Sequence, residues 1–205
     1  MLIFLKMNGE ILDKIQADFY AQGWAVCTDF LSAGEVAALL DRITALAGSL
    51  QKAGIGNQQN YQVRTEVRGD LIKWIDPVAE PLFNEIYLGK LDAIKDRFNR
   101  SFYLGIAKSE HHLAYYPEGT RYEKHVDTFK NSQDRVVSTV LYLNRNWQPG
   151  HGGELCLYPP GQPFQKIEPL AGRLVLFESV LPHEVLVCGA PRYSITGWFK
   201  RNSVF

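Results

Sequence analysis

The first hundred residues carry apolar side chains at helical spacing. Between residues 11 and 21 these side chains recur at intervals of three and four, and Gly23 follows them. This pattern predicts an amphipathic helix that ends at the glycine. The short run 24–27 that comes next predicts a strand.

Two further helices are predicted before residue 100. Ser32 and Glu35 have the spacing of a capping box, so we expect a helix that begins there and reaches Leu46. Apolar positions up to Phe98 predict another long helix from about Pro81. The polar stretch 54–76 between them is interpreted as a loop followed by an extended segment, long enough to be a lid or an entrance wall.

From about residue 101 the pattern changes to short β-branched and aromatic segments separated by glycine and proline turns. The six predicted strands are 113–116, 136–143, 154–158, 173–177, 184–188 and 194–199. Regular short strands of this kind favour a sandwich or jelly roll. We therefore predict a single α+β domain over 1–205, in which residues 1–100 are mainly helical support with a substrate loop and 101–205 form the jelly-roll core.

Composition narrows the class of protein. The chain has 205 residues, 46% of them hydrophobic, and its 22 basic and 22 acidic residues cancel. This balance argues against direct binding to nucleic acid. Cys27, Cys156 and Cys188 are interpreted as free thiols of a reducing compartment. The apolar run at 1–7 is too short for a membrane span and lacks the features of a signal peptide, so a cytoplasmic location without membrane contact is expected.

Candidate chemistry centres on His125-Val126-Asp127 and His183. Two imidazoles and one carboxylate can occupy one face of a ferrous ion and leave the opposite face open for other ligands. On an extended strand, residues i and i+2 point to the same side, so His125 and Asp127 are expected to share a face. His183 then has to come from a distant strand.

Arg192 is the candidate anchor for an anionic ligand beside that metal, because a guanidinium forms paired hydrogen bonds with a carboxylate. We expect it on the strand that follows His183 and next to that residue, joined by a tight turn. The other histidines, His111, His112 and His151, are interpreted as ordinary core or surface residues.

In combination these motifs resemble the catalytic core of the 2-oxoglutarate- and iron(II)-dependent dioxygenases. Within that family the chain is most similar to prolyl 4-hydroxylases of the hypoxia-sensor type and their bacterial relatives. The matching segments, in order, are Tyr116-Pro117, His125-Val126-Asp127, Tyr142-Leu143-Asn144, Gly152-Gly153-Glu154-Leu155, Pro182-His183-Glu184-Val185 and Arg192 to Trp198. The resemblance implies a double-stranded β-helix core buttressed by the N-terminal helices.

The resemblance also implies roles for individual residues. His125, Asp127 and His183 are expected to be the iron ligands. The four residues expected to hold 2-oxoglutarate are Arg192 and Tyr142 at its distal carboxylate, Thr196 beside them, and Tyr116 at the metal end. Trp198 is expected to pack beside the iron cavity, whereas Phe177, Tyr193 and Trp147 are interpreted as core.

A further match is the segment Arg68-Gly69-Asp70, which resembles a peptide-covering part of these hydroxylases. The resemblance implies an ion pair between Asp70 and Arg135 that braces the loop over the substrate. An isolated pair of solvated charges, by contrast, contributes little to stability.

The implied reaction is hydroxylation of an exposed proline in a cytoplasmic protein, an elongation factor or ribosomal protein being the kind of target suggested. Dioxygen and 2-oxoglutarate are consumed, succinate and carbon dioxide are released, and ascorbate is a candidate reductant. Two alternatives stay open: a hydroxylase of a small molecule or another side chain, and a metal- or oxoacid-binding sensor module without turnover. Succinate formation separates the enzymes from the sensor.

Overall fold

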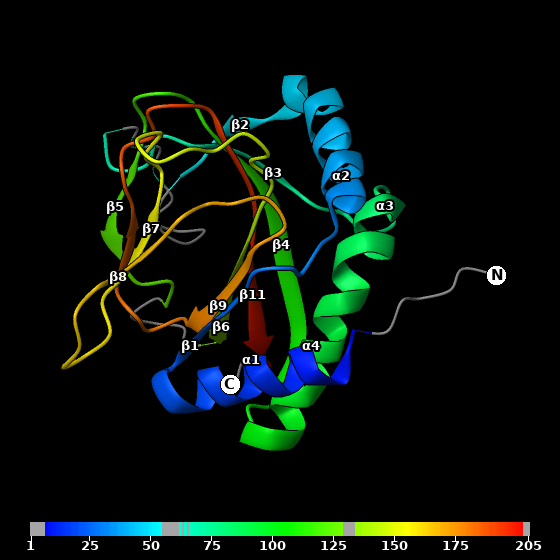
Figure 1. Ribbon diagram of the computed structural model, residues 1–205. Coiled ribbons are helices and arrows are strands. Elements are labelled where there is room, and N and C mark those ends of the chain that lie inside the picture. The colour runs from blue at the N-terminus through cyan, green and yellow to red at the C-terminus, as the bar shows by residue number, and fades with distance from the viewer. Residues whose placement is uncertain (1–6, 55–61, 63, 65, 129–133, 203–205) are drawn as a thin grey trace.

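The computed structural model describes residues 7–54, 62, 64, 66–128 and 134–202. Two antiparallel sheets face each other, and helices pack against the outer face of the larger one (Figure 1). This is the arrangement of an α+β protein with a jelly-roll core, as predicted. No helix within the described ranges is long and apolar enough to cross a membrane.

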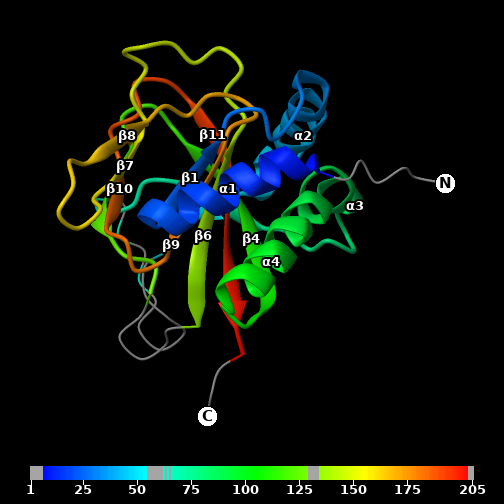
Figure 2. The same ribbon diagram turned by 60° about the horizontal axis from the view of Figure 1, so that its bottom comes forward.

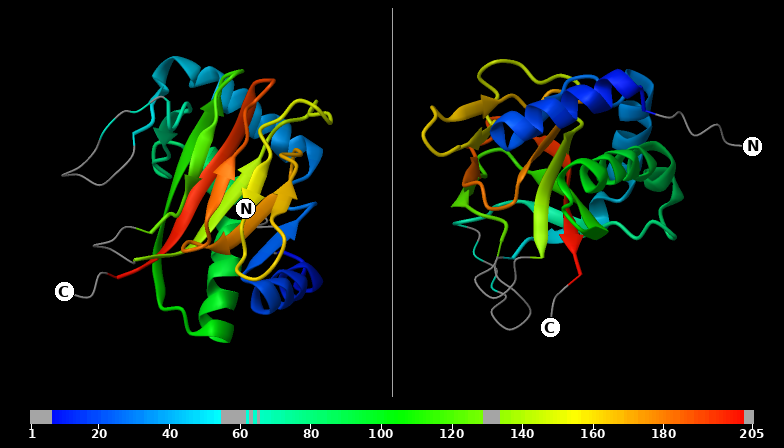
Figure 3. Two further views of the ribbon diagram at one scale, coloured as in Figure 1. Left: turned by 90° about the vertical axis from the view of Figure 1, so that its left-hand side faces the viewer. Right: turned by 90° about the horizontal axis from the view of Figure 1, so that it is seen from below.

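The larger sheet has seven strands in the order β1-β9-β6-β11-β4-β3-β2. They are β1 (Trp24–Cys27), β2 (Gln51–Lys52), β3 (Leu71–Trp74), β4 (Ile106–Tyr116), β6 (Arg135–Tyr142), β9 (Leu174–Glu178) and β11 (Arg192–Arg201). Strand β11 lies between β4 and β6, and Figure 3 shows β4 (green) and β11 (orange to red) as long neighbouring strands. The centre of the sheet is therefore its longest and best-paired part.

The smaller sheet has the order β5-β10-β7-β8. Its strands are β5 (Tyr122–His125), β7 (Leu155–Leu157), β8 (Gln165–Ile167) and β10 (His183–Val185). In Figure 1 these strands lie on the opposite side of the larger sheet from helices α2 and α4. The space between the two sheets is where the candidate site forms.

Alternation along the strands divides the protein into two apolar layers. In β9, Leu174 and Leu176 belong to the cluster shared with the helices, whereas Val175 and Phe177 belong to the cluster between the sheets. Because successive side chains of a strand point to opposite faces, one strand supplies both layers. Such a strand is buried on both sides and shows no simple polar alternation.

Four helices cover or flank the larger sheet: α1 (Gly9–Gln22), α2 (Ala33–Ala45), α3 (Pro81–Phe83) and α4 (Gly89–Phe102). Helix α2 begins with the predicted capping box, since Ser32 accepts from the Glu35 amide and the Glu35 carboxylate accepts from the Ser32 amide. Helices α1 and α4 lie side by side in Figure 2, and the Phe19 and Phe98 rings meet between them with centroids 4.7 Å apart. Their apolar stripes bury the outer face of the sheet.

Several boundaries differ from the prediction. The long helix expected from Pro81 is divided by a π-helical stretch at Asn84–Leu88, and strand β4 begins at Ile106, well before the predicted residue 113. Strands β2, β5 and β8 were missed altogether. Their sequences, and the start of β4, are polar where they face solvent, so hydrophobic periodicity could not reveal them.

Candidate metal and co-substrate site

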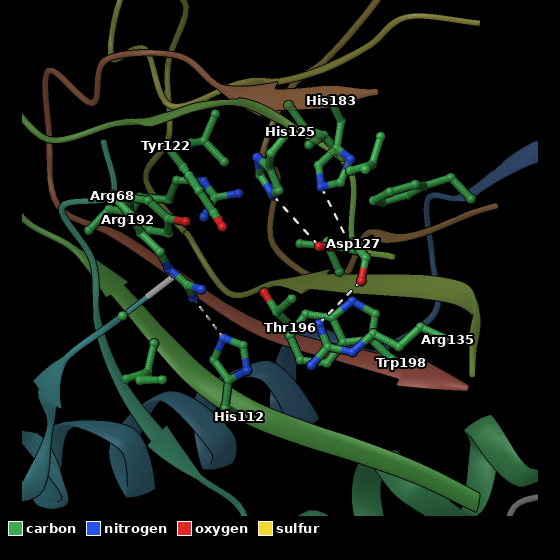
Figure 4. Close-up of a pocket in the computed structure, with 18 of the residues that line it drawn as sticks. Arg68, His112, Tyr122, His125, Asp127, Arg135, His183, Arg192, Thr196 and Trp198 are labelled. Atoms are coloured by element: carbon green, nitrogen blue, oxygen red, sulfur yellow. Dashed lines mark hydrogen bonds and ion pairs between the residues drawn. The ribbon is translucent and has the colours of Figure 1, made fainter. Parts of the chain in front are cut away.

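The three predicted metal ligands converge at one end of the space between the sheets (Figure 4). One donor atom from each of His125, Asp127 and His183 can be chosen so that all three lie within 4.8 Å of one another. The Nε2 atom of His125 is 3.6 Å from Oδ1 of Asp127, and Nε2 of His183 is 3.5 Å from Oδ2. Atoms at these separations can reach a common ion.

Strand pairing brings the two histidines together. His125 is the last residue of β5 and stands directly opposite His183, the first residue of β10. Asp127 points to the same side as His125, as expected, but it lies beyond the end of β5 and not on a continuous strand. Its amide instead donates to the Ser179 carbonyl at 2.9 Å, and this contact turns the chain and brings the carboxylate back to the histidines.

The backbone also orients both imidazoles. Nδ1 of His125 lies 2.7 Å from the Glu123 carbonyl oxygen, and Nδ1 of His183 lies 2.9 Å from that of Leu181. A carbonyl only accepts, so each Nδ1 carries the proton and each Nε2 keeps a lone pair for a metal. Burial lowers the pKa of His183 to about 4, which keeps this ring neutral near pH 7.

The Asp127 carboxylate is buried but ionised. Burial alone would raise the pKa of this carboxyl, but its attraction to the His183 and His125 imidazoles when these are protonated, together with the hydrogen bond from Ser138, lowers the pKa well below its ordinary value. Ser138 donates to Oδ2 at 2.6 Å, and its oxygen is 3.0 Å from the Ser179 hydroxyl. An anionic oxygen between two neutral rings suits a divalent cation.

Arg192 enters the same cavity from the larger sheet. The predicted adjacency to His183 is wrong, because β10 and β11 belong to different sheets that face each other across the cavity. The guanidinium donates to the Gly153 carbonyl at 2.9 Å and to Ser194 Oγ at 3.1 Å, which fixes its position. A Cβ at Gly153 would lie 2.9 Å from Cδ of Arg192, so this position requires a glycine.

The charge of Arg192 is not neutralised by the described residues. No carboxylate within the described ranges forms an ion pair with it, although its side chain is buried. Tyr116 and Tyr142 place their rings 4.8 and 5.0 Å from its CZ carbon. The Tyr142 hydroxyl is buried without a hydrogen-bond partner. A buried cation and an unpartnered phenol together call for an anionic ligand.

The cavity that the metal ligands and Arg192 line has a volume of about 650 Å³, within the range of small-molecule sites, and Tyr142 lies behind its lining. Of the predicted residues, Tyr116, Thr196 and Trp198 line it together with the metal ligands and Arg192. Phe177 was interpreted as core, yet it also lines the cavity, and its ring contacts His183 with centroids 4.6 Å apart. His112, interpreted as ordinary, faces the cavity too.

The predicted ion pair between Asp70 and Arg135 is wrong. Asp70 accepts two hydrogen bonds from Arg68, at 2.7 and 2.9 Å. Arg135 donates to Glu110 at 2.7 Å, and its guanidinium covers the Trp198 ring at 3.5 Å. Arg68 and Arg135 therefore each pair with a different carboxylate from the one expected. No motif in the sequence marked Glu110 on β4 as the partner of Arg135.

Sequence reasoning also missed the residues that support the ligands. Ser138, Ser179 and Tyr122 touch them, but serine and tyrosine are common in strands and turns and form no motif with the metal ligands. Only the three-dimensional contacts distinguish these residues from other serines and tyrosines of the chain.

The donor set fits ferrous iron and 2-oxoglutarate. Two neutral imidazoles and one carboxylate form the facial triad typical of non-haem iron oxygenases. The unpaired guanidinium of Arg192 and the free hydroxyl of Tyr142 match a carboxylate at the other end of a bound oxoacid.

Comparisons with known proteins agree with this geometry. The sequence profile of the 2OG-Fe(II) oxygenase superfamily matches residues 111–200. The human protein "Prolyl hydroxylase EGLN3" is 31% identical over 207 residues, which cover 92% of this chain and 84% of that protein. A "Hypoxia-inducible factor prolyl hydroxylase" of Caenorhabditis elegans is 32% identical over 198 residues, 88% of this chain but only 27% of that longer protein.

Solved structures give the same result. A Pseudomonas putida prolyl-4-hydroxylase has a TM-score of 0.84 and 37% identity, covering 94% of this chain and all (100%) of that one. A Trichoplax adhaerens prolyl hydroxylase in complex with a hypoxia inducible factor peptide fragment has a TM-score of 0.83 and 28% identity, covering 93% and 89%. The predicted double-stranded β-helix fold is confirmed.

The chain therefore belongs to the 2OG-Fe(II) oxygenase superfamily and, within it, to the group of the prolyl hydroxylases. It is an oxidoreductase that requires iron(II) and 2-oxoglutarate, as the sequence predicted.

Proposed function

We propose that this enzyme hydroxylates a prolyl residue exposed on a cytoplasmic protein. The observation that carries the proposal is the meeting of His125, Asp127 and His183 with the unpaired Arg192 in one cavity whose wall is aromatic. The relatives named prolyl hydroxylases support the same substrate class. Elongation factors and ribosomal proteins are the candidate targets, in line with the bacterial resemblance.

The co-substrate is assigned to the Arg192 end of the cavity. Arg192 binds the distal carboxylate of 2-oxoglutarate, and the Tyr142 hydroxyl donates to the same group. Burial raises the pKa of Tyr142, so this hydroxyl keeps its proton. Thr196 lies on the same face of β11 as Arg192. Tyr116, expected at the metal end, stands opposite Arg192 on β4 with its ring 4.8 Å from CZ of the guanidinium, so we assign it to the Arg192 end of the cavity.

Bound iron and 2-oxoglutarate supply the oxidation: one oxygen atom of dioxygen enters succinate and the other enters the substrate. The residues of this chain do the positioning. The Phe177 ring packs against the His183 imidazole. Trp198 lines the cavity from the larger sheet, and the Arg135 guanidinium covers its ring. A dry, shaped cavity of this kind limits side reactions with water.

A protein substrate is favoured by the wall at the cavity entrance. Trp74 is 51% exposed although it lines the cavity, and its ring lies 6.2 Å from that of Trp198 and 5.1 Å from that of His112. An exposed aromatic surface leading into a pocket suits an apolar ring such as that of proline. A small polar metabolite gains little binding energy from contact with this apolar surface.

The test is turnover by purified protein supplied with iron(II), 2-oxoglutarate and ascorbate. We expect succinate formation that rises when a proline-containing peptide of the target protein is added, and a mass gain of one oxygen atom on that peptide. The matched peptide with alanine in place of proline is expected to give only the basal rate. Comparing the proteomes of cells with and without the enzyme identifies the modified protein.

The two alternative functions predict different results. A small-molecule hydroxylase forms succinate but responds to no proline peptide and leaves no proline-dependent oxygen on cellular proteins. A sensor module binds 2-oxoglutarate and forms no succinate. Either result contradicts the proposed function.

A further inference from the structure

The ring of Tyr122 lies flat against the metal ligand His125. Their centroids are 3.6 Å apart and the ring planes differ by 18°. The hydrogen bond from His125 Nδ1 to the Glu123 carbonyl fixes one point of the imidazole, but the ring can still rock about that bond. A face-to-face neighbour removes this freedom, so Tyr122 determines the direction in which Nε2 points.

The Arg68 guanidinium also packs on the Tyr122 ring. Its CZ carbon lies 4.7 Å from the centre of the Tyr122 ring, a cation–π distance. The guanidinium is itself fixed by the two hydrogen bonds to Asp70, whose side chain is fully buried. Nη2 of Arg68 also lies 3.4 Å from Nε2 of His112, which must accept, because a guanidinium only donates.

Burial makes this arrangement rigid. The Arg68 side chain is 12% exposed, and the Asp70 carboxylate holds the pKa of Arg68 above its ordinary value although burial opposes this. Burial, together with the charges of Arg68 and Arg135, lowers the pKa of His112 well below its ordinary value, so the ring is neutral. A neutral acceptor and a buried anion surround the cation with matching partners.

The backbone of the segment is attached to the same strand. Arg68 forms a β-bridge with Tyr122, the Gly69 amide donates to the Arg121 carbonyl at 3.0 Å, and the Glu123 amide donates to the Val67 carbonyl at 2.9 Å. A Cβ at Gly69 would lie 2.6 Å from Cβ of Thr120. The glycine is therefore required for this close approach.

We propose that Arg68-Gly69-Asp70 is a positioning element for the metal centre, which acts through Tyr122 to fix the His125 imidazole. Gly69 lets the segment approach β5, Arg68 covers the tyrosine, and Asp70 compensates the buried charge. The role assigned to the segment from the sequence was a brace for a substrate loop. The contacts instead lead from the segment to a metal ligand.

Metal binding by the apoprotein tests this without turnover. We expect Tyr122→Leu to weaken cobalt(II) binding, measured by calorimetry, about tenfold, as loss of groups that orient ligands commonly does. Its cobalt absorption bands in the visible range are expected to shift, because the His125 donor is no longer held in one orientation. Tyr122→Phe keeps the ring and is expected to retain wild-type affinity and spectrum.

A double variant tests the other half of the element. Arg68→Met with Asp70→Asn removes the covering cation without leaving an unpaired buried carboxylate, which would unfold the region. We expect the same direction of change in cobalt affinity and spectrum as for Tyr122→Leu, and thermal melting shows that the variant is folded.

Tyr115→Leu is the matched control, because Tyr115 stacks on Tyr193 with centroids 4.8 Å apart, and neither residue lines the cavity. It is expected to lower the melting temperature and leave cobalt binding unchanged. The proposal is overturned if Tyr122→Leu binds cobalt as tightly as the wild type and only the KM for a peptide rises. It is equally overturned if Tyr115→Leu weakens cobalt binding as much as Tyr122→Leu.

Discussion

The hydroxyl of Ser138 donates a hydrogen bond of 2.6 Å to Oδ2 of Asp127, and both groups are buried. Because this hydroxyl uses its proton on the carboxylate, the Ser179 hydroxyl 3.0 Å away has to donate to Ser138. One oxygen of the carboxylate is thus held by a two-hydroxyl relay. The other, Oδ1, faces His125 Nε2 and accepts no hydrogen bond from the described residues.

Removing this hydroxyl is expected to loosen the metal site. In Ser138→Ala, Oδ2 loses its donor and the carboxylate can rotate, so we expect iron(II) or manganese(II) affinity to fall about 10- to 100-fold. Calorimetric titration of the apoprotein measures the change. The matched control is Thr139→Val, which removes the neighbouring buried hydroxyl of β6 on the face toward Tyr87. Equal losses in both variants would show that the effect is general destabilisation.

Removing a metal ligand is expected to abolish activity without unfolding the protein. Asp127→Ala leaves two neutral imidazoles and no anionic donor, so succinate formation should fall to background and manganese(II) binding should be lost. Because the folded environment holds the pKa of this carboxyl below its ordinary value, the carboxylate stabilises the apoprotein at neutral pH. Its loss should therefore lower the melting temperature, while the variant still unfolds cooperatively. Treatment of the wild type with a chelator should likewise stop turnover, reversibly on addition of iron(II). Residual metal-dependent succinate formation in Asp127→Ala would contradict the assignment.

Arg192 is expected to act on the co-substrate. Hydrogen bonds to charged groups contribute about 1.5–3 kcal/mol each, so Arg192→Ala should raise the apparent KM for 2-oxoglutarate about 10- to 100-fold. Tyr142→Phe removes one neutral donor and should have a smaller effect in the same direction. Steady-state kinetics with varied 2-oxoglutarate measures both. An unchanged KM in Arg192→Ala would show that the anion binds elsewhere.

Gly197 is expected to be intolerant of any side chain. A Cβ there would lie 1.9 Å from Nδ1 of His111 and 2.8 Å from the Glu110 carbonyl oxygen. Gly197→Ala should therefore lower the free energy of unfolding by about 1–3 kcal/mol or more, as measured by urea denaturation. Combining it with His111→Ala removes the nearer clash, so the two changes should not be additive. Additive losses of unfolding free energy would show that the clash with His111 does not cause the destabilisation.

Acid is expected to destabilise the apoprotein through His111. Burial lowers the pKa of this imidazole from the ordinary 6.5 to about 4. At pH values between 4 and 6.5 the imidazole is therefore protonated in the unfolded chain and neutral in the folded protein. The contribution to stability is complete above pH 6.5 and is lost as the pH falls toward 4, about 3 kcal/mol at most. Urea denaturation near pH 7 and pH 4.5 measures the difference. His111→Gln should reduce it, and an unchanged difference would contradict the assignment.

Local chemistry made part of this protein predictable. The Ser32 and Glu35 capping box and the strand Trp24–Cys27 depend on residues close together in the chain, and both were found where predicted. The metal ligands and Arg192 were recognisable because their residue types and order are those that the chemistry requires. Strand β5 was not predictable, because the residues between Tyr122 and His125 are polar. They form a strand only by pairing with β10.

The composition and order of the residues decided the class of fold, the three donors and the proposed anion anchor, because helix caps, side-chain periodicity and ligand chemistry depend on local sequence. Which residues face each other was decided by the packing of the two sheets. His183 and Arg192 lie nine positions apart yet stand on opposite walls, and Asp70 pairs with Arg68 while Arg135 pairs with Glu110. Such partners are set by the distances between strands in the folded chain, and spacing along the sequence does not encode those distances.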